Sequence, residues 1–315
     1  MPAAGARLYS NGKGRPSGTS RLNPRLSEAG GSKKQGYILP DLPGSELMFG
    51  LSPVAAAIQQ GRRTIHGLYV QRESQGDIPR TRTNEILALA SEHDIPVTTR
   101  YKDMMYRSVG GANHQGVIMK VSEYSAPRIS ELSPFVDGSY NITEKVLTTR
   151  EPRRRFPFWV YCHDLQDSSN FGSIIRSAMF FGADAVLTPA QNVVKPTPLV
   201  SKASSGAMEC MDIYRVSRHE NFFAKVQKNG WLVVCATISS AGDTRMETID
   251  SMPPLSAPTI LVIGNERSGI PDSILEQSDL NVYISPRAEL PNYIDSLNAG
   301  VAAGIILSSL KFKGE

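Results

Sequence analysis

The chain has 315 residues, 40% of them hydrophobic and 20% charged, which is typical of a globular protein with room for two domains. No apolar run approaches the roughly 20 residues of a transmembrane helix, and three cysteines without short spacing argue against disulfides or a zinc site and for a reducing compartment. The net charge of +4 is concentrated in residues 1–35, with seven Lys and Arg against one acid; the remainder has 27 against 29 and is not generally basic.

Residues 1–40 are rich in Gly, Ser, Pro and Arg and contain few large apolar residues. A disordered tail is one interpretation of this composition. A mitochondrial transit peptide is the other, because such peptides are rich in Arg and Ser and poor in acids. The composition alone leaves both open.

Residues 46–124 predict a small α/β domain. Its first helix is expected to begin at Ser52-Pro53, with Ser as the cap and Pro at the first helical position, and to end near Gly61. The other expected elements are a strand at 65–70, a helix at 84–92, a strand near 96–97, a helical turn at 103–107 and a strand at 116–121.

Basic residues in this domain occur as Arg62-Arg63 and as Arg80 and Arg82. Each one taken singly is most simply a solvated surface charge, whereas the group together is suited to contacting phosphates. Residues 125–155 then predict a linker, since Pro, Ser, Gly and Thr recur without periodicity. The linker ends at Arg153-Arg154-Arg155, which would serve either solubility or an RNA backbone contact.

Residues 156–315 alternate apolar strands and amphipathic helices, which predicts an α/β domain with a parallel sheet. Neither a Gly-x-Gly-x-x-Gly turn nor a Walker loop follows any strand, so ordinary dinucleotide and P-loop sites are disfavoured. The expected strands are 158–162, 184–187, 211–214, 231–236, 259–263 and 281–284, and the expected helices are 170–181, 198–204, 219–229, 271–277 and 296–310.

The stretch from Asp164 to Phe181 is the first of three motifs. Its Asp-Ser-Ser-Asn cluster suits a helix N-terminus, and Ile174, Ile175, Ala178 and Met179 predict the packing face. Arg176 falls off that face, where an arginine is usually just a solvated charge. Together with Asn170 it would stand beyond a strand's carboxyl end, where open α/β sheets bind ligands.

Two later segments complete the set. A strand runs into Gly264-Asn265-Glu266-Arg267-Ser268-Gly269, and another ends at Ile284 before Ser296-Leu297-Asn298 opens a helix rich in Ala and Gly. Taken singly, these polar residues read as helix caps, Ser296 in particular as the N-cap of the last helix. The loop from Lys202 to Met208, rich in small residues, is a secondary candidate that is also consistent with a tight turn.

The three motifs together, Asn-x5-Arg, Gly-Asn-Glu-x2-Gly and Ser-Leu-Asn, resemble the SpoU (TrmH-like) branch of the SPOUT RNA methyltransferases. The resemblance covers about residues 156–311. It implies a parallel-sheet domain with a trefoil knot, a ribosomal-protein-like substrate-binding domain before it, S-adenosylmethionine as cofactor and a homodimer. It also implies 2′-O-methylation of a guanosine in mitochondrial large-subunit ribosomal RNA, and so favours the transit peptide.

The resemblance implies roles for nine residues. The catalytic set is Arg176, Asn170, Glu266, Ser296 and Asn298, and the cofactor set is Thr237, Gly264, Ile284 and Leu297. Without it, Ile284 and Leu297 would simply be core. Because a guanidinium stays protonated at neutral pH, Arg176 is expected to position the ribose hydroxyl and stabilise developing charge, or to act as a base only with help.

Two alternatives stay open at this point. The same fold could serve as a non-catalytic RNA-binding or ribosome-assembly factor, although such a factor would have no use for the full motif set. A methyltransferase could also act on transfer RNA, against which the sizeable domain before the linker argues by resemblance only.

Overall fold

A computed structural model describes residues 42–72, 81–142, 145–148, 156–191, 193–238, 244–291 and 296–312. These residues belong to one compact unit. The expected tail or transit peptide at residues 1–40 and the triple arginine at 153–155 lie outside the described residues. Within the described part of the chain, no helix combines the length and apolar character needed to cross a membrane.

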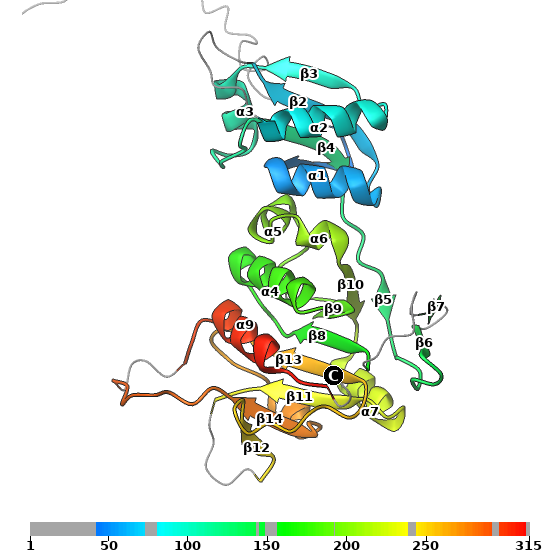
Figure 1. Cartoon of the computed structure of the whole chain (residues 1–315), viewed down its shortest axis with the longest axis vertical. Helices are drawn as coiled ribbons and strands as arrows, with labels where there is room; N and C mark the ends of the chain where they lie inside the picture. The colour runs from blue at the N-terminus through cyan, green and yellow to red at the C-terminus, as the bar shows by residue number, and fades with distance from the viewer. Residues whose placement is uncertain are drawn as a thin grey trace, which may run out of the picture. The chain divides into compact units, whose positions relative to one another are not determined.

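The N-terminal domain contains a four-stranded sheet in the order β1-β4-β2-β3, in which β4 is antiparallel to its neighbours and β3 is parallel to β2 (Figure 1). Its core joins apolar side chains of the sheet to those of two helices. The bounds are β1 Ser45–Phe49, α1 Leu51–Gln60, β2 Ile65–Gln71, α2 Thr81–Glu92, β3 Val97–Arg100, α3 Lys102–Ser108 and β4 Val117–Ser122.

The small α/β domain is therefore confirmed, with two differences. The strand β1 was not expected, since five residues preceding a helix carry little pattern of their own. The prediction that Ser52 caps α1 is wrong: the N-cap is Gly50, without a side-chain hydrogen bond, and Ser52 is already helical. The helix does end at Gly61, which adopts a left-handed conformation.

The C-terminal domain is built on an eight-stranded sheet in the order β12-β14-β11-β13-β8-β9-β10-β5. Every pairing in it is parallel, which confirms the expected class. The strands are β5 Arg128–Ile129, β8 Phe158–Cys162, β9 Ala185–Pro189, β10 Asp212–Val216, β11 Leu232–Ala236, β12 Met246–Thr248, β13 Thr259–Ile263 and β14 Leu280–Tyr283.

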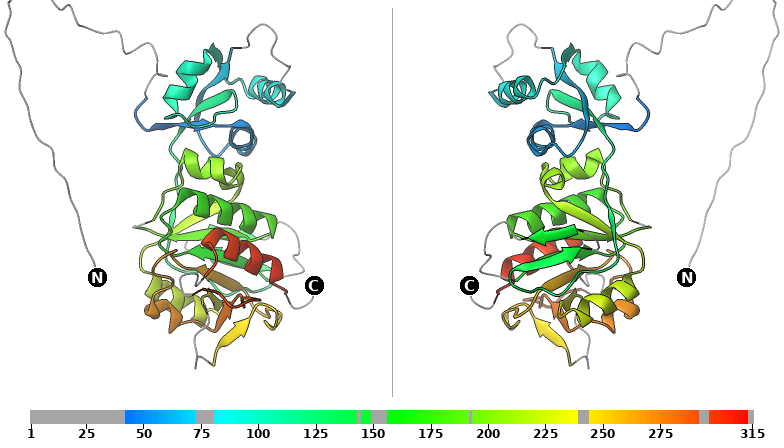
Figure 2. Two further views of the ribbon diagram at one scale, coloured as in Figure 1. Left: turned by 90° about the vertical axis from the view of Figure 1, so that its left-hand side faces the viewer. Right: turned by 90° about the vertical axis from the view of Figure 1, so that its right-hand side faces the viewer.

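Helices cover both faces of this sheet, as the views in Figures 1 and 2 show for α4 and α9 on one side and α7 on the other. Strand β8 is buried throughout: Phe158, Val160 and Cys162 face the α4 and α9 side, while Trp159 and Tyr161 face the α7 side. The helices are α4 Ser168–Phe180, α5 Pro198–Ala203, α6 Ala207–Cys210, α7 His219–Lys228, α8 Asp272–Leu275 and α9 Ala299–Ser309.

The segment expected to be a linker contributes to the core of this domain. Besides β5 it contains the hairpin of β6, Ser139–Ile142, and β7, Lys145–Thr148. Leu132, Tyr140 and Ile142 are buried, and the Tyr140 hydroxyl accepts a hydrogen bond of 2.9 Å from the Trp159 indole. The apolar residues of this segment are too widely spaced to show a helical or strand period. The sequence therefore predicted a linker and gave no sign that these residues are buried.

Two side-chain predictions for the C-terminal helices are wrong. Met179, expected on the packing face of α4, is 44% exposed, while Ile174, Ile175 and Ala178 are buried as expected. The last helix begins at Ala299 with Asn298, and not Ser296, as its N-cap. The short edge strand β12 was not expected at all.

Candidate active site

Three cofactor candidates lie at the carboxyl ends of neighbouring strands. Thr237, Gly264 and Ile284 directly follow β11, β13 and β14, which are adjacent in the order β14-β11-β13. The Thr237 amide donates to the Val282 carbonyl at 2.9 Å, which continues the parallel pairing of β11 with β14 to the carboxyl end of β11. This is the edge at which open α/β sheets bind ligands.

The turn after β13 is tightly folded around a glycine. A Cβ atom on Gly264 would lie 2.6 Å from the Gly269 carbonyl carbon, so a side chain there would force the turn open. The turn closes through a pair of backbone hydrogen bonds of 3.0 Å between Asn265 and Gly269. It leaves Glu266 exposed at its tip.

Asn265 is a structural residue that sequence reasoning missed. Its side-chain oxygen accepts from the amides of Arg267 at 2.8 Å and Ser268 at 3.0 Å, which is an Asx turn. Its side-chain amide donates to the Asp164 carbonyl at 2.5 Å. The turn after β13 is thereby attached to the loop that precedes α4. The sequence signal for such a turn was the asparagine that follows a glycine at the end of a strand.

A chain of side-chain hydrogen bonds joins the three motifs. Asn298 donates through Nδ2 to Oδ1 of Asn170 at 2.9 Å, and Asn170 donates through Nδ2 to Oε1 of Glu266 at 2.8 Å. Asn298 also caps α9, its side-chain oxygen accepting from the amides of Gly300 and Val301. Residues 96 and 128 positions apart are therefore brought into contact at one place.

Asn170 is held by the cap of its own helix. The side chain of Asp167 accepts from the amides of Ser169 at 2.6 Å and Asn170 at 3.0 Å, which confirms the expected capping chemistry at this N-terminus. The cap leaves the Asn170 side chain available to link Asn298 and Glu266. The start of α4 therefore lies at the junction of the three motifs.

Arg176 is exposed and points to a different neighbour. It lies six positions after Asn170 in α4, which at about 100° per residue turns it away from the Asn170 side. Its Nη1 donates to the Ser205 hydroxyl, in the turn between α5 and α6, at 3.0 Å. The secondary candidate loop from Lys202 to Met208 is thus beside Arg176.

Two further candidates directly precede Asn298, the N-cap of α9. Ser296 and Leu297 are exposed, Leu297 to 49%, while Ile284 is partly buried against the core.

Lys202, in the secondary candidate loop, hydrogen-bonds through Nζ to the Gln115 side chain of the N-terminal domain. Within the described part of the chain, no cluster of His, Cys, Asp or Glu could hold a metal ion.

Two family descriptions match successive parts of the chain. Residues 47–127 match the RNA 2′-O ribose methyltransferase substrate-binding domain, and residues 157–308 match the SpoU rRNA methylase family. The two matches correspond to the N-terminal domain and to the C-terminal parallel-sheet domain.

Similar proteins extend over nearly the whole chain. A protein of Homo sapiens named mitochondrial rRNA methyltransferase 1 is 34% identical over 89% of this chain and 77% of its own length. The protein of that name from Schizosaccharomyces pombe is 30% identical over 92% and 98%. A crystal structure of a rRNA methyltransferase of Sinorhizobium meliloti with AdoMet bound covers 84% of this chain and 86% of its own at a TM-score of 0.60 and 20% identity, which shows the same fold. The chain belongs to the SpoU rRNA methylase family.

Proposed function

We propose that this chain transfers a methyl group from S-adenosylmethionine to the ribose 2′-hydroxyl of a guanosine in mitochondrial large-subunit ribosomal RNA. The main support is the series of hydrogen bonds from Asn298 to Asn170 and from Asn170 to Glu266. It connects all three motifs beyond the carboxyl ends of the strands, where open α/β sheets bind ligands. The names of the human and fission-yeast relatives support the mitochondrial and ribosomal part. A mitochondrial matrix location follows from that substrate.

The cofactor candidates are chemically suited to an adenosine-containing ligand. When bound, S-adenosylmethionine supplies the methyl group on a positively charged sulfur. Ile284 and Leu297 would contact its adenine with apolar side chains, one partly buried and one 49% exposed. Gly264 and Thr237 would contact it mainly through backbone groups, and the absence of a side chain on Gly264 keeps the turn after β13 closed against Gly269.

Arg176 would act on the ribose. An arginine donates hydrogen bonds and keeps its positive charge, so it would hold the 2′-oxygen and stabilise the negative charge that develops as the proton leaves. Glu266, Asn170 and Asn298 would keep the surrounding loops in place through their hydrogen bonds. Ser296, exposed beside them, would contact the substrate nucleotide.

An arginine and tyrosine cluster in the N-terminal domain supports RNA as the substrate. The Arg72 guanidinium lies 5.4 Å from the ring of Tyr101 and donates to its hydroxyl at 2.8 Å, and the Arg100 guanidinium lies 5.8 Å from the Tyr69 ring. Tyr101 is 66% exposed. Tyr69 is partly buried, so Tyr101 is the ring available for contact. An exposed ring beside guanidinium groups is suited to stacking an unpaired base while the cations neutralise phosphates.

An apolar surface at the end of α4 supports a homodimer. Phe180 is 82% exposed, and Met179 and Phe181 beside it are also exposed. Contiguous large apolar side chains in water are unusual on a monomer and are typical of an association surface.

The test is to map 2′-O-methylation of mitochondrial ribosomal RNA with and without the protein. One guanosine of the large-subunit RNA should lose its methyl group without the chain and regain it with the wild type but not with Arg176→Ala. Purified chain should also methylate a matching ribosomal fragment and leave transfer RNA unmodified. The transfer-RNA alternative is favoured if the reverse holds, and the non-catalytic alternative is favoured if calorimetry detects no S-adenosylmethionine binding.

A further inference from the structure

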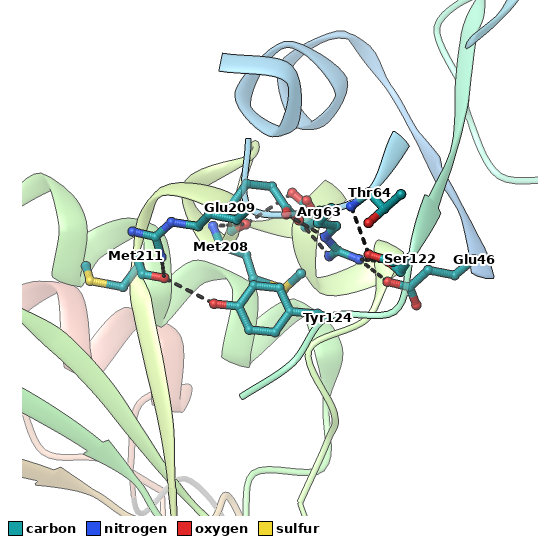
Figure 3. Close-up of polar contacts among 11 residues, drawn as sticks. Glu46, Arg63, Thr64, Ser122, Tyr124, Met208, Glu209 and Met211 are labelled. Carbon is teal, nitrogen blue, oxygen red and sulfur yellow. Dashed lines mark hydrogen bonds and ion pairs between the residues drawn. The ribbon is translucent and has the colours of Figure 1, made fainter. Parts of the chain in front are cut away.

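A buried ion pair joins the two domains (Figure 3). Arg63, which follows α1 in the N-terminal domain, donates through Nε at 2.7 Å and through Nη2 at 2.9 Å to the two carboxylate oxygens of Glu209 in α6. The two side chains are only 1% and 0% exposed. This paired geometry is the strongest that arginine and a carboxylate can form.

The rest of the guanidinium is also occupied. Its Nη1 contacts the carboxylate of Glu46 in β1 and donates to the Ser122 carbonyl at 3.1 Å. Burial by itself lowers the pKa of Arg63, but the hydrogen bonds and charges of Glu209 and Glu46 outweigh it, so the pKa is raised. The cation is therefore held in its charged form by partners from both domains.

A second group of contacts surrounds this pair. Arg62 forms an ion pair with Asp212 at 2.7 Å and donates to the Met211 carbonyl at 3.1 Å. Tyr124 donates to the same carbonyl at 3.2 Å, and its ring lies 5.1 Å from the Arg63 guanidinium (Figure 3). The start of β10 is thereby attached to the N-terminal domain and to the segment between the domains.

The segment that carries Glu209 also contacts Arg176. The turn between α5 and α6 contains Ser205, which accepts the Arg176 hydrogen bond at 3.0 Å, and Gly206. Gly206 has a φ of +87°, and a Cβ there would lie 2.8 Å from the Ser52 carbonyl of α1. The Glu209 amide donates to the Gly206 carbonyl at 3.0 Å. The turn is therefore packed against α1 while Ser205 contacts α4.

We propose that Arg63 and Glu209 are positioning residues for methyl transfer: their buried pair holds the substrate-binding domain against α6 and, through the turn between α5 and α6, fixes the guanidinium of Arg176. This inference rests on the proposed function. Displacing either partner of a buried ion pair leaves a charge without its counterpart, which opposes movement of the two elements relative to each other. Small errors in the placement of a reacting group are known to reduce turnover strongly.

The experiment compares Glu209→Gln, Arg63→Met and the double variant Arg63→Met with Glu209→Met, in which apolar side chains replace both charges. Glu131→Gln, which removes the exposed ion pair with Lys225, is the control. We expect kcat on the RNA fragment to fall by at least about tenfold in each of the three variants of the buried pair. The double variant should lose no more activity than either single variant, because all three break the same contact between Arg63 and Glu209. The affinity for S-adenosylmethionine should stay within about twofold of wild type, because the cofactor candidates follow β11, β13 and β14 or precede α9, whereas α6 packs mainly on α1, α4 and α5.

Two further measurements separate positioning from simple destabilisation. Amide hydrogen exchange at Ser205 and Gly206 should accelerate in Glu209→Gln but not at the turn after β13. Ser205→Ala should lower kcat while leaving that exchange unchanged, since it removes only the bond to Arg176. A folded double variant with the kcat of the wild type overturns the positioning role. So does a loss of kcat that disappears at lower temperature, because such a loss would come from partial unfolding. If the wild type itself transfers no methyl group, the proposed function fails.

Discussion

At the scale of single residues, the site depends on exposed polar side chains that also make specific hydrogen bonds within the protein. Arg176 is exposed and has Ser205 as its hydrogen-bond partner, yet it is the candidate for contacting the ribose. Asn298 caps a helix and links two motifs at once. Sequence reasoning selected both, although it assigned the cap to Ser296.

Arg176 should be required for turnover and not for folding. We expect Arg176→Ala to lower kcat by about 100-fold or more, as removal of one donor to a developing oxyanion does. Arg176→Lys should also lose most activity, because an ammonium lacks the planar fork. Single-turnover methyl transfer measures the effect, and cofactor affinity by calorimetry is the control. Near-normal turnover in a folded alanine variant would remove Arg176 from the mechanism.

Asn298 allows its two roles to be separated by substitution. Asn298→Asp keeps an oxygen that can accept from the Gly300 and Val301 amides but removes the donor to Asn170. Asn298→Ala removes both and should lower the free energy of unfolding by about 1 kcal/mol. We expect both variants to lose activity but only the alanine variant to lose stability, as measured by urea denaturation. Full activity in the aspartate variant would contradict a role for the link.

His163, at the end of β8, should make stability depend on pH. Burial lowers its pKa from the ordinary value of 6.5, opposed by Asp164 and Glu220 and assisted by His219. Below pH 6.5 the unfolded chain therefore binds more protons than the folded chain, so the free energy of unfolding should fall as the pH drops from 6.5 toward the folded-state pKa.

The measurement for His163 is the free energy of unfolding between pH 5 and 7. His163→Gln should flatten the pH dependence, whereas the same change at exposed His66 should leave it as in the wild type. An unaltered slope in His163→Gln would show that another group is responsible.

At the scale of elements, helices and strands with strong periodicity were predicted well and those without it were missed. Strand β8 and helix α4 follow from continuous and amphipathic apolar patterns. The short strands β5 and β12 have two and three residues and exist only through their pairing with β10 and β14. No local pattern can encode such pairing.

The arginine and tyrosine cluster on β2, β3 and the start of α3 gives a prediction at this scale. Tyr101→Ala should weaken binding of single-stranded RNA about 5- to 100-fold, the range expected for one stacked base. Tyr101→Phe keeps the ring, loses only the hydroxyl contact with Arg72 and should bind nearly as the wild type does. Fluorescence anisotropy at fixed salt measures both, and equal affinity of the alanine variant would exclude stacking on this ring.

At the scale of the whole molecule, the site and the contact between domains arise from segments far apart in sequence. Arg63 and Glu209, 146 residues apart, pair in the interior. From the sequence alone, both residues would be expected on the surface, since charged residues are seldom fully buried. The trefoil knot implied by the family resemblance stays a prediction.

The exposed phenylalanines at the end of α4 test the proposed homodimer. Phe180→Asp should shift the molar mass measured by light scattering from dimer toward monomer, because a charge cannot be buried in an apolar interface without large cost. Val136→Asp, at another side chain that is 59% exposed, is the control and should leave the mass unchanged. A wild-type chain that is monomeric at all concentrations would contradict the dimer.

The sequence by itself determined the fold class, the order of the main elements and the residues of the three motifs, because apolar periodicity and short polar signatures are local properties. Only the tertiary structure decided that Asn298, Asn170 and Glu266 form one hydrogen-bonded chain, that Arg176 contacts Ser205, and that Arg63 is buried against Glu209. The physical reason is that burial and pairing depend on which distant surfaces meet when the sheet and its helices close, and that information belongs to the packed chain as a whole.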